Sequence, residues 1–155
     1  MAEAHDLAVP VAAEFRHTYL RPTAGADFGG QIVASPQLVD FCRTYHLTLL
    51  AYSVLLNGAY TRGDRSIGPE YQGSDSTLRL RTLNDVAKEI GATPNQVVLS
   101  WLLRGDPAVI PIVGGTTQEQ LAENLDAGAV HLTRDQMTRL QSAGNPHPDD
   151  IDRMS

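Results

Sequence analysis

Hydrophobic residues along the chain fall into two kinds of segment, which differ in length and in spacing. Three short segments, at residues 10–15, 47–53 and 108–113, are mostly apolar. A continuous apolar run, clearest in the second segment, is typical of a parallel strand that is covered on both faces. Elsewhere apolar residues recur every three or four positions, which predicts amphipathic helices. The predicted helices cover about residues 36–45, 80–90, 94–102 and 117–126, and a last helix follows Thr133.

The ends of these helices carry start and stop signals. Ser35 precedes Pro36, and proline is favoured at the first position of a helix. Thr93 and Gln96 have the spacing of a capping box, in which each side chain satisfies a backbone N–H group at the helix start. Gly91 is expected to end the preceding helix, because glycine readily adopts left-handed backbone angles.

The order of strands and helices predicts an α/β protein with parallel strands and right-handed crossovers. Loops rich in glycine or polar residues are expected at about residues 20–34 and 57–75. With 155 residues the chain has the length of one domain, 1–155. Residues 145–155 are polar and are expected to form a mobile tail. Residues 2–7 resemble the end of a helix, so the sequence fits a naturally short protein or a trimmed one.

The composition of the chain argues against several classes of binding partner. The chain has 18 acidic and 12 basic residues and a net charge of −6. Without a basic stripe, a nucleic-acid backbone is not an expected partner. The apolar runs are too short to cross a bilayer and no signal-peptide pattern is present, so we expect a cytoplasmic protein without membrane contact. Five scattered histidines and one cysteine, Cys42, predict neither a metal site nor an internal disulfide.

Residues 109–124 place a strand, two glycines and a helix start in direct succession. The apolar stretch Val-Ile-Pro-Ile-Val precedes Gly114 and Gly115, and Thr117 then offers an N-cap with Gln120 as capping-box partner. Free backbone N–H groups and the positive end of the helix dipole favour an anion at such a turn. We therefore expect an anion or phosphate site here, with a tight turn that binds nothing as the alternative.

Three stretches of the chain resemble the aldo-keto reductase family. They are residues 109–124, residues 49–55 (Leu-Leu-Ala-Tyr-Ser-Val-Leu) and residues 92–102 (Ala-Thr-Pro-Asn-Gln-Val-Val-Leu-Ser-Trp-Leu). The resemblance extends from about residue 9 to residue 144. It implies units of a (β/α)₈ barrel whose site lies at the carboxyl ends of the strands.

The three strands look like the sixth, seventh and eighth strands of that family's barrel. The expected fold is thus α/β, a partial TIM-barrel-like arrangement of about three parallel strands that is completed by oligomerisation or by a partner. The catalytic Asp, Tyr, Lys and His of the family lie on earlier strands. The resemblance therefore assigns none of them to this chain, and we do not expect it to reduce carbonyls at a useful rate by itself.

The resemblance also implies half of a nicotinamide cofactor site. Ser53, Leu55 and Gly58 match the family loop around the pyrophosphate, whereas Glu123 and Asn124 match residues that contact the adenine. The segment at the adenosine phosphate is matched by Gly114, Gly115, Thr116 and Thr117.

Two departures from the family pattern argue against full cofactor binding. The basic residues that usually hold the 2′-phosphate fall where Gly114, Thr116 and Gln120 stand. Because a hydrogen bond to a charged group is worth about 1.5–3 kcal/mol, NADP binding should be weakened. Glu14 replaces an amide that usually holds the nicotinamide carboxamide. We therefore expect that no cofactor is required, with NADP bound only if the half-site survives.

A second candidate site follows the first strand. Glu14 is a candidate general base, and His17 or Tyr19 a candidate acid, at the end of the strand where barrel sites lie. The structural alternative is that Glu14 pairs with Arg16 or with a neighbouring arginine and so closes the end of the strand. Further along the chain, Asn57, Tyr60 and Arg62 either contact a ligand or belong to a solvated loop, and Trp101 is expected in the core.

These observations leave three hypotheses, which we rank in the following order. The first is a truncated reductase repurposed for acid–base chemistry, such as cyclisation, dehydration or isomerisation of a small hydrophobic metabolite. The second is an NAD(P)H-dependent reductase completed by a second polypeptide, and the third is a non-catalytic binding or regulatory module. A three-stranded parallel sheet has two unpaired edges, so we expect a homo-oligomer or a partner polypeptide.

Overall fold

The computed structural model of the protein describes residues 10–145. Its three parallel strands lie in the order β1 (Ala12–Arg16), β2 (Thr48–Tyr52) and β3 (Val109–Pro111). The strands are connected by α1 (Pro36–Thr44), α2 (Ser76–Ile90) and α3 (Pro94–Leu103), and α4 (Gln118–Asp126) and α5 (Arg134–Ser142) follow β3. Short 3-10 helices cover Leu56–Gly58, Pro69–Tyr71 and Ala127–Ala129. The predicted α/β class is confirmed, and the sheet is open rather than closed into a barrel.

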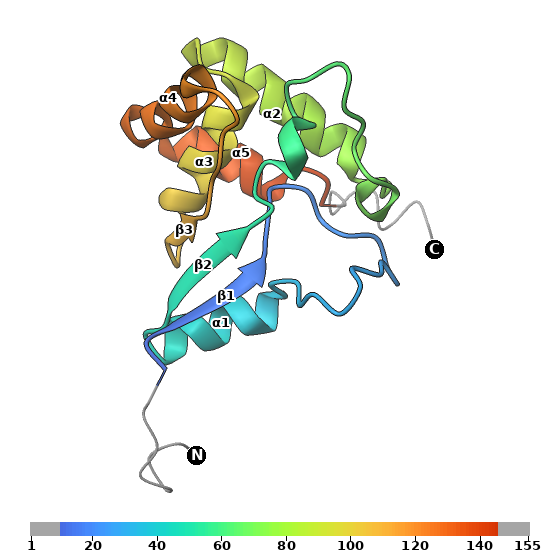
Figure 1. Ribbon diagram of the computed structural model, residues 1–155, viewed down its shortest axis with the longest axis vertical. Helices are drawn as coiled ribbons and strands as arrows, with labels where there is room; N and C mark the ends of the chain where they lie inside the picture. The colour runs from blue at the N-terminus through green and yellow to red at the C-terminus, as the bar shows by residue number, and fades with distance from the viewer. Residues whose placement is uncertain (1–9, 146–155) are drawn as a thin grey trace, which may run out of the picture.

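The helices α2 to α5 form one group, and α1 lies apart from it. In Figure 1, α1 lies on the sheet side of the molecule, where it contacts β2, whereas α2, α3, α4 and α5 lie together at the other end. In the view from above, α5 runs alongside α2, and these two helices are in contact. Because α3 contacts α2, α4 and β3, it is the central helix of this group.

The two faces of the sheet differ in what covers them. The strand register places Ala13, Leu49 and Val109 in one row, and this row packs into the core. The opposite face carries the row Glu14, Leu50 and Ile110, in which Ile110 is 50% exposed. The expectation that β2 is covered on both faces is therefore wrong for residues 10–145, because their helices cover one face only. We refer to the other face as the open face.

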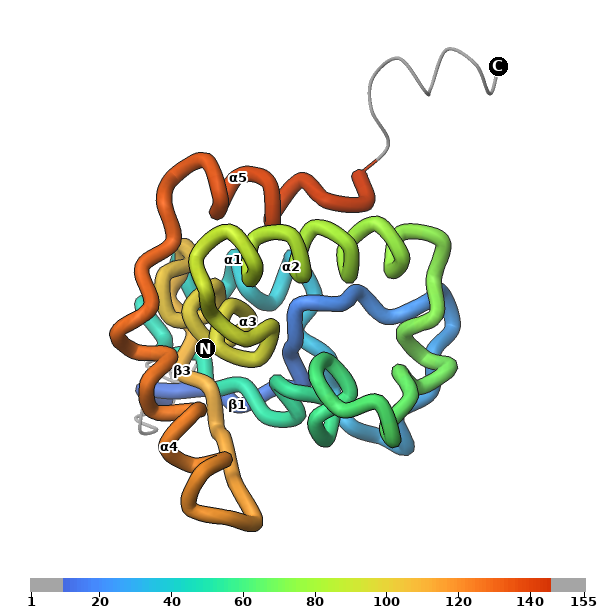
Figure 2. The backbone as a smooth tube through the Cα atoms, turned by 90° about the horizontal axis from the view of Figure 1, so that it is seen from above, coloured from blue at the N-terminus to red at the C-terminus, as the bar shows by residue number. Residues whose placement is uncertain are grey.

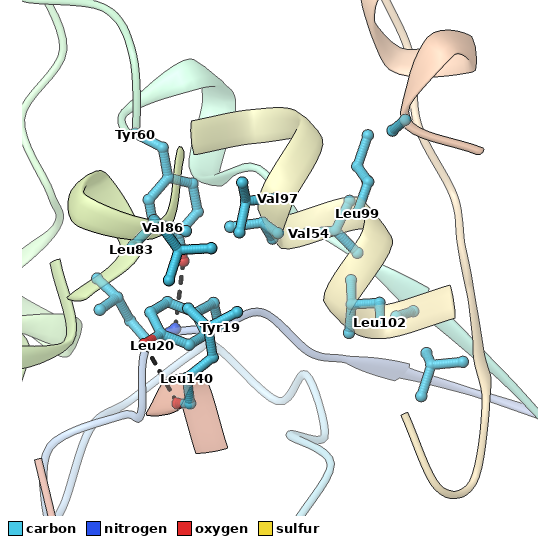
Figure 3. Close-up of a cluster of buried hydrophobic side chains, with 14 of the residues drawn as sticks. Tyr19, Leu20, Val54, Tyr60, Leu83, Val86, Val97, Leu99, Leu102 and Leu140 are labelled. Atoms are coloured by element: carbon cyan, nitrogen blue, oxygen red, sulfur yellow. Dashed lines mark hydrogen bonds between the residues drawn. The ribbon is translucent and has the colours of Figure 1, made fainter. Parts of the chain in front are cut away.

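The core lies between the covered face and the helices (Figure 3). Two tyrosines reach into it and end in hydrogen bonds. The Tyr19 hydroxyl donates to the carbonyl of Leu140 at 3.2 Å, and the Tyr60 hydroxyl accepts from the backbone N–H of Leu20 at 3.2 Å. These bonds satisfy polar groups that would otherwise be buried at a cost. Cys42 is buried.

Most of the predicted helix signals are formed. Ser35 caps α1, Gly91 ends α2 with a φ of 66°, and Thr93 and Gln96 make both bonds of a capping box. At α4 the predicted capping box is only half formed. Thr117 accepts from the backbone of Gln120, but the Gln120 side chain accepts from the backbone N–H of the neighbouring Thr116 at 2.9 Å instead.

Several predictions lie outside the described part of the chain. The tail that is predicted to be mobile spans residues 145–155, and of these the structure describes residue 145 alone. The predicted helix end at residues 2–7 also lies outside the described residues. Between residues 10 and 145, no helix is both long enough and apolar enough to pass through a membrane.

Candidate functional site

A cavity of about 880 Å³ lies where the loops that follow β2 and β3 meet the helix α4. The structure brings together in its wall eight of the nine residues predicted to bind a cofactor. They are Ser53, Leu55, Gly58, Gly114, Gly115, Thr116, Glu123 and Asn124. The ninth, Thr117, caps the first turn of α4 beside them. We refer to this space as the cofactor cavity, after the prediction made for the residues of its wall.

The turn between β3 and α4 is tightly held. A Cβ atom added to Gly115 would lie 3.0 Å from the backbone nitrogen of Leu121, so any other residue at this position would force the turn to shift. A Cβ atom at Gly114 would meet no other atom within 4 Å, which leaves open space beside the turn. Asn124 donates from Nδ2 to the carbonyl of Gly114 at 3.2 Å. The side chain of Asn124 thereby fixes the turn against α4.

Glu123 is positioned by the start of α3. Its carboxylate accepts a hydrogen bond of 2.6 Å from the Thr93 hydroxyl, and its backbone carbonyl accepts from Nε2 of Gln96 at 3.3 Å. Thr93 and Gln96 are the two members of the α3 capping box. The motif that begins α3 therefore also holds the carboxylate at the cavity wall.

The loop after β2 has an unusual backbone. Ser53, Leu56 and Asn57 have φ values of 56°, 48° and 56°, although none is glycine. Left-handed backbone is uncommon for such residues, especially for a leucine, and costs on the order of 1–3 kcal/mol. Strain of this kind collects at functional sites, where the surrounding structure maintains it.

Two arginines, Arg62 and Arg65, supply positive charge to the cofactor cavity. Arg62 donates to the carboxylate of Asp64 at 2.6 Å, and this bond raises the pKa of Arg62 and lowers the pKa of Asp64. The turn at Gly114 and Gly115 lacks basic residues, as the sequence indicates. The loop after β2, however, brings two arginines to the same cavity. Arg62 is among the ligand contacts predicted from the sequence, whereas no pattern in the sequence pointed to Arg65.

The other loop candidates divide between cavity and core. Asn57 lines the cofactor cavity, whereas the Tyr60 hydroxyl lies in the core, 2.8 Å from the hydroxyl of Thr18. Burial raises the pKa of Tyr60. Tyr60 is therefore neither solvated nor a ligand contact.

The donor and acceptor groups around the cofactor cavity fit a nucleotide. Backbone N–H groups at the start of α4 and two arginines suit phosphate groups. Asn95 lines the same cavity, and its buried Oδ1 has no hydrogen-bond partner among residues 10–145. The carboxylate of Glu123, in the same wall, is an acceptor that suits the amino group of a base.

Glu14, His17 and Tyr19 are not brought together. Glu14 is exposed on the open face, while His17 lies on the helix-covered side with its ring centroid 5.9 Å from that of Trp101. Burial, reinforced by the charge of Arg79, lowers the pKa of His17 to about 4, so the imidazole is neutral at pH 7. Because Tyr19 is also buried, its pKa is raised to about 12.

The structural alternative for Glu14 is also not formed. Arg16 donates from Nε to the Tyr71 hydroxyl at 3.0 Å and from Nη1 to the Gln31 side chain at 2.9 Å. Its guanidinium lies 4.7 Å from the ring centroid of Phe28. In the part of the chain that the structure describes, Glu14 makes no ion pair with Arg16.

Curated relatives match parts of the chain. Over 68 residues it is 40% identical to a pyridoxine 4-dehydrogenase of Escherichia coli K12, which covers 44% of this chain and 24% of that enzyme. Over 129 residues it is 33% identical to an uncharacterized oxidoreductase of Mycobacterium tuberculosis H37Rv, which covers 73% of this chain and 39% of that protein. The chain thus spans well under half the length of these relatives.

A solved structure shows a similar arrangement. The crystal structure of a thermostable aldo-keto reductase in complex with the inhibitor epalrestat superposes with a TM-score of 0.53 and 33% sequence identity. The superposition covers 68% of this chain and 33% of that one. The profile of the Aldo/keto reductase family matches residues 5–145. This chain therefore belongs to the aldo-keto reductase family.

Proposed function

We propose that this chain is the cofactor-binding part of an NAD(P)H-dependent aldo-keto reductase and that it binds the adenosine and diphosphate portions of the cofactor. The observation that carries this proposal is the convergence of eight family-matched residues from two loops and α4 on one cavity. The second hypothesis from the sequence is thereby favoured over the first.

Different residues of the cofactor cavity bind different parts of the cofactor. Backbone N–H groups at the Thr117-capped start of α4, together with Arg62 and Arg65, bind phosphate groups. Glu123, fixed by Thr93, accepts from the base. The bound cofactor supplies a hydride. The strained loop at Ser53 and Asn57 shapes the wall between the two loops.

Carbonyl reduction needs groups that these residues do not supply. The catalytic Asp, Tyr, Lys and His would come from five further strands, carried by the same polypeptide or by a second one. Such strands would cover the open face, where Leu50 and Ile110 present apolar side chains. The partner in this proposal is therefore the complementary part of the barrel.

The acid–base hypothesis has less support from the geometry. Its base, Glu14, lies on the open face, and its candidate acids, His17 and Tyr19, lie on the covered side. It stays a prediction, which a Glu14→Gln variant with a loss of turnover on a small metabolite would support.

The test is a titration of the purified chain with NADPH, followed by nicotinamide fluorescence, with the mass of the protein in solution recorded alongside. We expect saturable binding that Glu123→Ala weakens. Asp126→Ala is the matched control, because Asp126 is an exposed carboxylate at the other end of the same helix and lies outside the cofactor cavity. Absence of binding by a well-folded chain would overturn the proposal.

A further inference from the structure

Arg16 is the last residue of β1 and lies at the carboxyl end of the sheet. Along this strand Phe15 packs against the core, so Arg16 belongs to the opposite side, together with Glu14. In the strand register Arg16 lies beside Tyr52 of β2, and the next residue, Ser53, is in the wall of the cofactor cavity. Arg16 is therefore at the end of the strands where barrel sites lie, close to the proposed cofactor site.

The guanidinium of Arg16 is held in place by uncharged groups from two loops. Its Nε donates to the Tyr71 hydroxyl at 3.0 Å, and its Nη1 donates to the side-chain oxygen of Gln31 at 2.9 Å. The ring centroid of Phe28 lies 4.7 Å from the guanidinium carbon. Because Tyr71 is only 2% exposed, its hydroxyl is a fixed anchor. The orientation of the guanidinium is thus set before any ligand binds.

The charge of Arg16 is not neutralised by a carboxylate within residues 10–145. Neither Glu14, on the same side of β1, nor Glu70, next to Tyr71 in the chain, makes an ion pair with it. A half-buried cation whose partners are all neutral attracts an anion more strongly than a cation that is already paired. Four other arginines of the described residues do pair with carboxylates, namely Arg21, Arg43, Arg62 and Arg139.

Part of the guanidinium also remains available for hydrogen bonds. An arginine carries five N–H donors in one plane, and the bonds to Tyr71 and Gln31 use two of them. The Nη2 atom of Arg16 has no acceptor among the described residues, and it is not one of their buried atoms. Planar, fixed N–H groups of this kind suit a carboxylate, whose two oxygens can accept at the same time.

From these observations we infer that Arg16 binds a carboxylate group of the substrate, so that the substrate is a carbonyl compound that carries a carboxylate. The inference rests on the proposed function, because it names the substrate class of that reaction. Binding through the carboxylate holds the carbonyl group of the same molecule near the cofactor, as hydride transfer requires. The carbonyl carbon receives the hydride of the bound cofactor, the carbonyl oxygen receives a proton from the complementary part of the barrel, and the carboxylate is unchanged.

The experiment compares benzoate with benzamide, which have nearly the same shape but differ in charge. The purified chain is titrated with each compound, and the Nε–H resonance of Arg16 is followed by NMR. We expect benzoate to move this resonance in a saturable way and benzamide to bind at least about 10-fold more weakly, because hydrogen bonds to a charged acceptor are the stronger ones. A resonance that does not respond to benzoate, or equal affinity for both compounds, would overturn the inference.

Two variants test the role of the planar donor group. Arg16→Lys keeps the positive charge but loses the planar guanidinium, and it should weaken benzoate binding about 10-fold. Arg81→Ala removes an exposed arginine of α2 and should leave benzoate binding unchanged. The comparison of benzoate with benzamide needs only the unaltered chain, so it stands even if Arg16→Lys does not fold.

A parallel titration with NADPH separates this inference from the proposed function. Arg16→Lys should bind NADPH as tightly as the unaltered chain does. An equal loss of benzoate and NADPH affinity would assign Arg16 to a phosphate of the cofactor and would overturn the inference. Benzoate binding by a chain that does not bind NADPH would support the carboxylate site and count against the proposed function.

Discussion

The hydroxyl of Thr93 donates a hydrogen bond of 2.6 Å to the carboxylate of Glu123. Thr93 also accepts from the backbone N–H of Gln96 as the N-cap of α3. One side chain therefore joins the start of a core helix to a wall of the cofactor cavity. In this protein the stability of α3 and the geometry of the cavity are linked through a single oxygen atom.

Replacing this oxygen should affect both properties. Thr93→Val should lower the free energy of unfolding by about 0.5–2 kcal/mol, the usual cost of a lost N-cap, and should also weaken NADPH binding. Thr133→Val removes the same type of capping box from α5, far from the cavity wall. It should reduce stability similarly but leave the NADPH dissociation constant unchanged. Denaturant unfolding and fluorescence titration together separate the two effects, and equal NADPH affinity in both variants would contradict the link.

The arginine missed in the sequence should set the preference between cofactors. Arg65→Ala should weaken NADPH binding about 10-fold and NADH binding less, because NADPH carries an additional phosphate. The difference should shrink as the salt concentration rises. Arg81→Ala, an exposed position outside the cofactor cavity, is the charge-matched control. Equal losses for the two cofactors would show that Arg65 does not read the 2′-phosphate.

The two adjacent glycines should respond differently to a methyl group. Gly115→Ala places a Cβ atom 3.0 Å from a backbone nitrogen and should destabilise the fold by about 1–3 kcal/mol. Gly114→Ala meets open space and should unfold at nearly the same denaturant concentration as the unaltered chain. Chemical denaturation curves of the two variants provide the check, and a reversed order would mean that the turn is built differently.

Core packing can be tested with two leucines. Leu83 has no exposed surface, so Leu83→Ala should lower the unfolding free energy by about 2–5 kcal/mol. Leu125 is 68% exposed, and Leu125→Ala should change it by no more than about 0.5 kcal/mol. Urea titrations monitored by circular dichroism measure both values. A large loss for Leu125→Ala would instead indicate that this side chain is covered in solution.

His17 should make stability depend on pH. Its pKa falls from 6.5 to about 4 in the folded chain, so the unfolded state binds more protons between these values. Stability should therefore be highest above pH 6.5 and decrease as the pH falls towards 4, by up to about 3 kcal/mol from this group. His17→Gln should flatten the profile in this window. An unchanged slope in that variant would assign the acid sensitivity to other groups.

Periodicity and capping signals account for most of the fold. The segment predicted as a strand at residues 47–53 is observed at Thr48–Tyr52, and the Thr93–Gln96 motif begins α3 as expected. Such features depend on residues that are close together in the sequence, so the sequence alone is enough to predict them.

The acid–base group and Arg65 were harder to predict than the other residues of the cofactor cavity, because their positions depend on how distant segments meet. Glu14 and His17 are three residues apart, an odd spacing that directs side chains of extended backbone to opposite faces. Their common position near the end of a strand suggested proximity, but the alternation excludes it. Arg65 reaches the cofactor cavity through the path of a long loop, which no local pattern specifies.

The edge of β1 carries one more consequence of the fold. Arg16 receives a hydrogen bond from the backbone N–H of Ala34 and donates its own to the carbonyl of Ile32, both at 2.9 Å. The chain thereby covers the carboxyl end of its own first strand. Within β1, an incoming strand then has the backbone groups of Ala12 and Glu14 left to pair with, and these residues lie roughly 7 Å apart at about 3.3 Å per residue. A polypeptide that extends the sheet at this edge, rather than at the edge of β3, must therefore join it at the amino end of β1, in a register that the protein has already restricted.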